Sequence, residues 1–95
     1  MKPARKIERA LRKAQAALDR LEALRRKDLL TPERFLEATP AIRDYLATVE
    51  RELAHDAGAS RAYAPDRAAV LARTRSLADS VGLGQVWLET MGEEP

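Results

Sequence analysis

The chain lacks cysteine and is poor in aromatic residues, with one tryptophan, two tyrosines and one phenylalanine among 95 residues. Without cysteine, disulfide bonds, thiolate metal ligands and cysteine nucleophiles are excluded. Isoleucine and valine are also scarce, so the residues that favour β-strands are too few for a sheet. Alanine, leucine, arginine and glutamate dominate instead, and all four favour helices. We therefore predict an all-α protein with a single helical domain over 1–95.

Long apolar runs are absent as well. The longest are a few residues, too short for a helix that spans a membrane. Residues 1–6 include three cations and lack the apolar stretch of a signal peptide. We expect a cytoplasmic protein with no membrane partner.

Groups that commonly carry catalysis are sparse. The chain has one histidine, its four glycines are scattered, and it has neither a glycine-rich phosphate loop nor a nucleophile elbow. We therefore expect no enzymatic activity and no cofactor.

A long helical hairpin is the main structural prediction. The first helix is expected over 3–28, where apolar residues recur at alternating spacings of four and three, as in helices packed side by side. These residues are Ile7, Leu11, Ala14, Leu18 and Leu21. The second helix is expected over 32–57, with Thr31 as its N-cap and Pro32 at its first position. Pro40 removes a backbone hydrogen bond, so this helix is expected to be kinked or split near that residue.

The two helices also predict their own register. Residues that face each other in an antiparallel hairpin have sequence numbers with a constant total. Leu18 with Ile42, Ala14 with Leu46, Leu11 with Val49, Ile7 with Leu53 and Leu24 with Leu36 all give the same total. The centre implied is Leu30, close to the Thr31-Pro32 turn.

Residues 58–65 are rich in small residues and predict a linker. A third helix is expected over 66–81, capped by Asp66 and ended by Gly82. A short helix over 83–91 should follow it and pack across one end of the bundle.

One fragment suggests metal binding as a further alternative. Glu52 and His55 are spaced as Glu-x-x-His, which projects onto one face of a helix in di-iron carboxylate bundles. With Glu22 on the partner helix, this pattern resembles the small ferritin-like proteins carried by encapsulins, and the resemblance implies a metal-binding bundle. The hairpin register, however, places Glu22 nearer Ala38 than Glu52.

The positive charge is concentrated at the start of the chain. The formal net charge is +2 at pH 7, but residues 1–30 carry +6. Six cations fall on the face of the first helix opposite its apolar residues: Lys2, Arg5, Lys6, Arg9, Arg12 and Lys13. This face is either a solvated surface or a site for nucleic-acid phosphates or another acidic partner.

A second stripe on the second helix includes Ala41 and Tyr45. Either the third helix covers it, or two copies of the chain associate into a bundle. We predict a homodimer, with Tyr45, Leu83, Trp87 and Met91 as candidate interface residues. The leading hypothesis is a non-enzymatic interaction module: an adaptor, a chaperone-like protein or a small complex subunit. Nucleic-acid binding through the basic face is the alternative.

Overall fold

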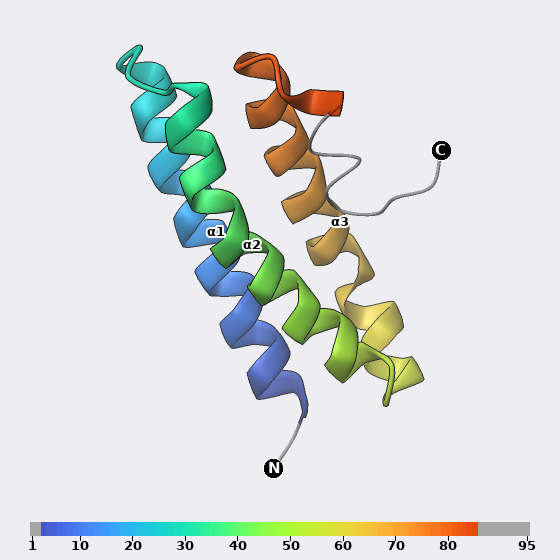
Figure 1. Cartoon of the computed structure of the whole chain (residues 1–95). Helices are drawn as coiled ribbons and strands as arrows, with labels where there is room; N and C mark the ends of the chain where they lie inside the picture. The colour runs from blue at the N-terminus through green and yellow to red at the C-terminus, as the bar shows by residue number, and fades with distance from the viewer. Residues whose placement is uncertain (1–2, 86–95) are drawn as a thin grey trace.

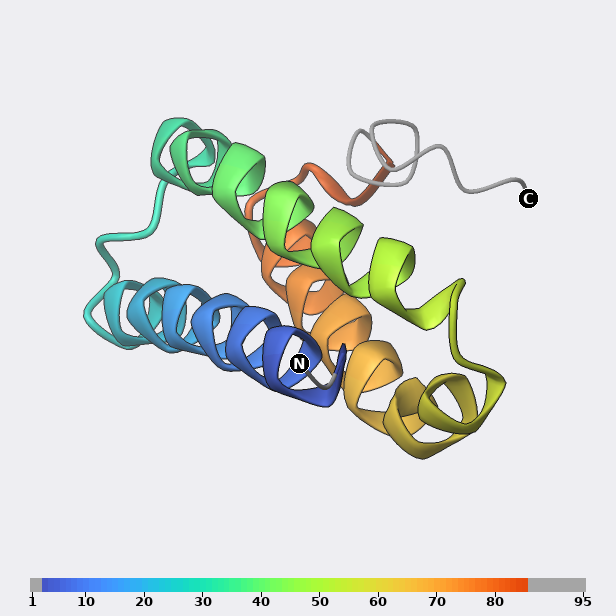
Figure 2. The same ribbon diagram turned by 90° about the horizontal axis from the view of Figure 1, so that it is seen from below.

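Three α-helices make up the fold over residues 3–85, the part of the chain that the computed structural model describes. They are α1 (Pro3–Arg26), α2 (Pro32–Leu53) and α3 (Ala57–Ser80). Short connections make consecutive helices antiparallel, so the chain runs up, down and up again (Figure 1). α3 packs against both helices of the hairpin, as Figure 2 shows from below. None of these helices has the length and apolarity needed to cross a membrane.

α1 ends at Arg26, two residues before its predicted end, and its end is closed by backbone hydrogen bonds. Asp28 has a positive φ of 58°, in the left-handed region. This turn lets the Leu29 amide donate to the Leu24 carbonyl at 2.8 Å and the Asp28 amide donate to that of Arg25 at 3.0 Å. The pair of bonds is the Schellman motif, a common way to satisfy the last carbonyl groups of a helix.

α2 is one uninterrupted helix through Pro40, so a split at that residue is wrong. The predicted start is confirmed: the Thr31 hydroxyl accepts a hydrogen bond from the Arg34 amide at 3.1 Å, and Pro32 opens the helix. Pro40 has no N–H to offer the Leu36 carbonyl. The Thr39 hydroxyl donates to that carbonyl instead, at 2.8 Å. A side chain thus replaces a backbone donor that proline removes.

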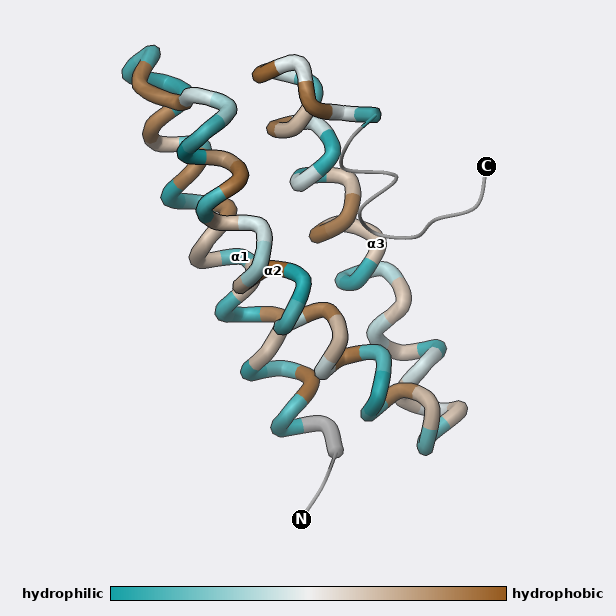
Figure 3. Tube along the Cα trace, viewed as in Figure 1, coloured by the Kyte–Doolittle hydropathy of each residue, from teal (hydrophilic) through white to brown (hydrophobic). Residues whose placement is uncertain are grey.

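The core between α1 and α2 uses the predicted apolar residues, with one correction. Ile7, Leu18, Ile42 and Val49 are fully buried, whereas Leu36 is 46% exposed. Phe35 is buried in its place. Counting back from Ile42 by three and then four residues gives Thr39 and Phe35, both buried, so the alternating spacing continues through them. Hydrophobic positions accordingly recur at intervals along α1 and α2 in Figure 3.

The boundary between the second and third helices was predicted wrongly. α2 ends at Leu53 rather than at residue 57, and the predicted linker over 58–65 is the first part of α3. Asp56, not Asp66, is the N-cap, and its carboxylate accepts from the Ala59 amide at 3.1 Å. The alanines of this segment favour helix, and Gly58 lies in the first turn, where the missing side chain costs little.

α3 is attached to the hairpin through a small buried face at its C-terminal half. Val70, Leu77 and Ala78 are buried, and so is Thr74, whose hydroxyl donates to the Val70 carbonyl at 2.7 Å. Gly82 ends the helix as predicted. Its φ is +77°, and the Leu83 amide donates to the Ala78 carbonyl at 2.8 Å. The predicted helix over 83–91 lies mostly outside the described residues.

Candidate functional site

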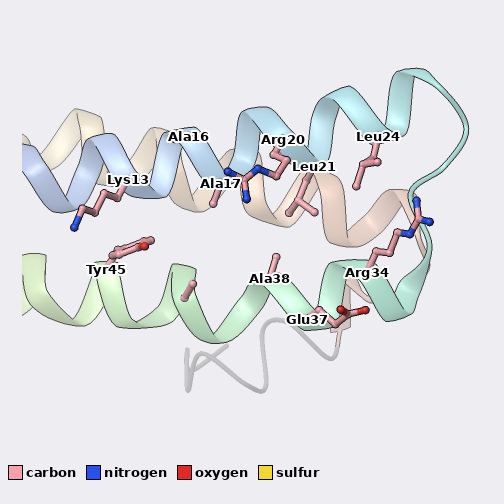
Figure 4. Close-up of a pocket in the computed structure, with 11 residues that line it drawn as sticks. Lys13, Ala16, Ala17, Arg20, Leu21, Leu24, Arg34, Glu37, Ala38 and Tyr45 are labelled. Atoms are coloured by element: carbon pink, nitrogen blue, oxygen red, sulfur yellow. The ribbon is translucent and has the colours of Figure 1, made fainter.

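An open groove runs along the hairpin between α1 and α2. Its larger part has a volume of about 620 Å³, and a further hollow of about 250 Å³ adjoins it, with Lys13 and Tyr45 lining both. No residue of α3 lines either part. Figure 4 shows Leu21 of α1 and Ala38 of α2 pointing toward each other across the groove. The third helix therefore leaves this side of the hairpin uncovered.

The floor of the groove is apolar and mostly made of small residues. From α1 come Ala10, Ala16, Ala17, Leu21 and Leu24, and from α2 come Ala38, Ala41 and the ring of Tyr45. Alanine side chains do not fill the space between two helices, so an external side chain can approach the backbone closely. Leu21 is almost completely buried, whereas Ala41 and Ala16 are exposed.

The rim of the groove is strongly basic. Five cations line it, with Glu37 as the one acidic residue of the lining. The cations are Lys6, Arg9, Lys13, Arg20 and Arg34. All five are exposed, and within the described part of the chain none of them forms a salt bridge. Arg34 donates a hydrogen bond to the Leu29 carbonyl at 2.9 Å.

The acidic residues of α1 point the other way, toward α3. α1 has three of them, and each accepts a hydrogen bond from an α3 side chain. Glu8 accepts from the Tyr63 hydroxyl at 2.7 Å, and Asp19 and Glu22 accept from the Arg73 guanidinium at 2.7 and 3.2 Å. A salt bridge from Arg67 to Glu50 makes a similar link between α3 and α2. The three carboxylates of α1 thus face α3, whereas four of its cations lie along the open groove: Lys6, Arg9, Lys13 and Arg20.

These contacts also shift two titratable groups. The hydrogen bond to Glu8, with smaller effects of burial and nearby negative charge, raises the pKa of Tyr63 above its usual 10.0. Hydrogen bonds to Glu22 and Asp19 raise the pKa of Arg73 in the same way. In both cases the hydrogen bonds stabilise the protonated form of the α3 side chain, which is the form that donates to the hairpin carboxylates.

The residues predicted for nucleic-acid binding divide between two sides of α1. Lys6, Arg9 and Lys13 border the groove, whereas Arg12 lines a shallow hollow with Tyr63 near α3. Arg5 is exposed and lines neither, and Lys2 lies outside the described residues. The sequence prediction missed Arg20 and Arg34, although the spacing of Arg20 from Lys13 is seven residues, which repeats the same helix face.

The residues of the metal alternative are not brought together. Glu22 lies near the C-terminal end of α1 and bonds to Arg73, whereas Glu52 lies near the C-terminal end of the antiparallel α2. They are therefore at opposite ends of the hairpin. His55 is exposed in the turn after α2, so Glu52 and His55 do not share a helix face. Residues 3–85 contain no group of three or more potential metal ligands.

The four predicted interface residues have different positions. Tyr45 is half-buried and lines the groove. Leu83 is half-buried and packs against the core beyond the end of α3. Trp87 and Met91 lie outside the described residues.

Comparison with known proteins gives no relative. No protein-family model, no curated protein and no solved structure matches the chain. A helical bundle alone implies no function, so the groove and its charges are the features of this chain that bear on function.

Proposed function

We propose that the protein is a non-enzymatic helical interaction module that binds a protein partner in the groove between α1 and α2. The observation that supports this most is the groove itself, an apolar hollow of about 620 Å³ that α3 leaves open. Apolar hollows rimmed by polar groups are typical of binding surfaces. In the cytoplasm, such a module would serve as an adaptor, a chaperone-like protein or a small subunit of a complex.

A pair of matched variants tests this proposal. Ala41→Phe places a ring in the groove, whereas Ala47→Phe places the same ring on an exposed position of α2 that does not line it. Proteins retained by the tagged wild-type chain are identified by mass spectrometry and then purified for direct binding assays. We expect a purified partner to bind the wild type and Ala47→Phe equally and to lose affinity for Ala41→Phe by about tenfold or more.

Circular dichroism and thermal unfolding of both variants show whether each remains folded. If every partner binds both variants equally well, the groove is not the binding surface and the proposal fails.

Nucleic-acid binding is a second candidate, supported by a specific observation. Arg5, Lys6, Arg9, Arg12 and Lys13 are all exposed, and in the described structure none of them is neutralised by a salt bridge. Unpaired cations on one helix are what phosphate binding requires.

The salt dependence of binding tests this candidate. Each phosphate contacted on duplex DNA should lower log K by about 0.9 per unit of log salt. Alanine at Arg5, Arg9 and Arg12 should flatten that slope without unfolding the protein, because the three side chains are exposed. An absence of mobility shift at about 50 mM salt, where such contacts are strong, would remove this candidate.

A further inference from the structure

We propose that the partner element which occupies the groove is an acidic amphipathic α-helix. This inference rests on the proposed function and adds the chemistry of the partner. The shape of the groove, its charge and the way in which α3 binds the hairpin each support it.

The shape of the groove fits a helix. The groove extends along α1 from Lys6 to Leu24 and is bordered by α2 over Arg34 to Thr48. At 1.5 Å per residue, the span on α1 is about 27 Å, the length of a helix of about 18 residues. A helix laid there would complete a four-helix arrangement, with a stripe of apolar residues at spacings of three and four on the floor. Small floor residues such as Ala17 and Ala38 allow the close approach that this packing needs.

The charge of the rim selects for an acidic helix. The five cations lie on both sides of the apolar floor, Lys6 to Arg20 on α1 and Arg34 on α2. Glutamates or aspartates that flank the apolar stripe of a bound helix would lie beside them. Complementary charge speeds association and rejects partners of the wrong charge more than it raises affinity. A basic helix would be repelled.

α3 provides an internal precedent for this arrangement. It is a helix bound to the other face of the same hairpin, and it places its donors Tyr63, Arg67 and Arg73 against hairpin carboxylates. On the face already occupied, hairpin carboxylates are thus met by hydrogen-bond donors of a bound helix, and two of these donors are cationic. The open face presents five cations, so a helix bound there would match them with carboxylates of its own.

Other occupants fit less well. Two copies of the chain joined groove to groove would bring two basic rims together, which costs free energy through like-charge repulsion. The phosphates of a nucleic acid would pair with the cations. The apolar floor between them, however, would then contact polar phosphates and sugars and gain no apolar partner. Only a helix with both carboxylates and apolar residues satisfies the floor and the rim together.

Two synthetic peptides of about 18 residues test the inference. Both carry leucine and alanine at helical spacings of three and four. One has glutamate at the flanking positions, and the other has lysine at the same positions. Binding to the full chain is measured by fluorescence anisotropy of labelled peptide. We expect the glutamate peptide to bind, more weakly as salt increases, and the lysine peptide not to bind.

Two charge-reversal variants locate the binding site. Lys13→Glu/Arg20→Glu changes the groove, whereas Arg43→Glu/Arg75→Glu makes the same change in net charge at exposed positions outside it. We expect the first pair of substitutions to lower the affinity for the glutamate peptide at least tenfold. The second pair should change that affinity less than threefold. Equal effects of the two pairs would mean attraction by overall charge alone and would overturn the inference.

Three further outcomes would also overturn it. The first is a Glu89→Gln/Glu93→Gln/Glu94→Gln variant that binds the peptide much more tightly, which would make the chain's own C-terminal residues the occupant. The second is a dimer that Ala41→Phe dissociates, which would make a second copy the occupant. The third is displacement of the peptide by duplex DNA at low salt.

If the glutamate peptide fails to bind but a natural partner still requires Ala41, the groove binds proteins of another chemistry and only this inference fails.

Discussion

The ends of α1 and α3 show how one residue closes a helix. Both helices end in the same pattern of backbone hydrogen bonds, and both need a residue in the left-handed region, with φ of 58° at Asp28 and +77° at Gly82. Glycine adopts this conformation without strain, whereas aspartate does so at a cost. Asp28 also places a negative charge at the C-terminal end of α1, where the helix dipole disfavours it.

Asp28→Gly should therefore stabilise the protein by about 1 kcal/mol, or roughly 5 °C in Tm for a chain of this size. Gly82→Ala should destabilise it by about 1–2 kcal/mol. A Cβ at Gly82 meets no atom within 4 Å, so this loss would come from the backbone alone. Asp28→Asn, which removes only the charge, separates the two contributions at Asp28. Unfolding of Asp28→Gly at or below the wild-type temperature would contradict the prediction.

The hydrogen bond between Tyr63 and Glu8 should give stability that depends on pH. Because folding raises the pKa of Tyr63 above 10.0, the contribution is fully present below pH 10.0 and is lost as pH rises through the folded pKa. Ultraviolet titration of Tyr45→Phe, which leaves Tyr63 as the sole tyrosine, should give a pKa above that of a free tyrosine. Glu8→Gln in that background should lower it. An unchanged titration curve would show that the hydrogen bond does not form in solution.

At the scale of elements, the hairpin depends on one alternating pattern that runs through both helices. Its residues are buried from Ile7 to Leu21 in α1 and from Phe35 to Leu53 in α2. Pro40 does not break the pattern, because Thr39 supplies the donor that Pro40 lacks. The pattern therefore predicted both helices, whereas the prolines alone suggested more breaks than exist.

Truncation of buried residues in this pattern should be costly. Leu18→Ala and Leu46→Ala should each destabilise the protein by about 2–5 kcal/mol, since both side chains are buried. The predicted register adds a stricter expectation. Leu11→Ala and Val49→Ala, as a facing pair, should couple in a double-mutant cycle, whereas Leu11→Ala and Ile42→Val should be additive. Chemical denaturation measures all of these. Additivity of the facing pair would show that the register is shifted.

α3 was the element that sequence reasoning described least well. Its buried face has few residues, and polar contacts such as Arg73 with Asp19 and Glu22 also link it to the hairpin. Such contacts join residues more than fifty positions apart and leave no periodic trace in the sequence. The helical start at Ala57 was missed for a different reason: alanine, glycine and proline together suggest a linker, although alanine itself favours helix.

At the scale of the whole molecule, the structure measures 41 × 28 × 19 Å, with the basic groove along one side of the hairpin. The predicted homodimer stays a prediction. If it forms, repulsion between basic rims should direct it to a surface other than the groove. We therefore expect Ala41→Phe to leave the sedimentation mass of the 10.6 kDa chain unchanged, whatever its oligomeric state. A mass that falls on this substitution, or that rises with salt because the repulsion is screened, would place self-association in the groove.

The sequence by itself determined the all-helical class, the two hairpin helices and the basic character of the first one, because these depend on local propensity and on the repeat of residues along one helix. Only the tertiary structure decided which side of the hairpin α3 covers. That choice depends on residues of distant helices meeting, both at the buried Val70 and Leu77 and in contacts such as Glu8 with Tyr63. It leaves Lys13, Arg20 and Arg34 around one hollow, although Arg34 is on another helix and no local pattern connects it to the others.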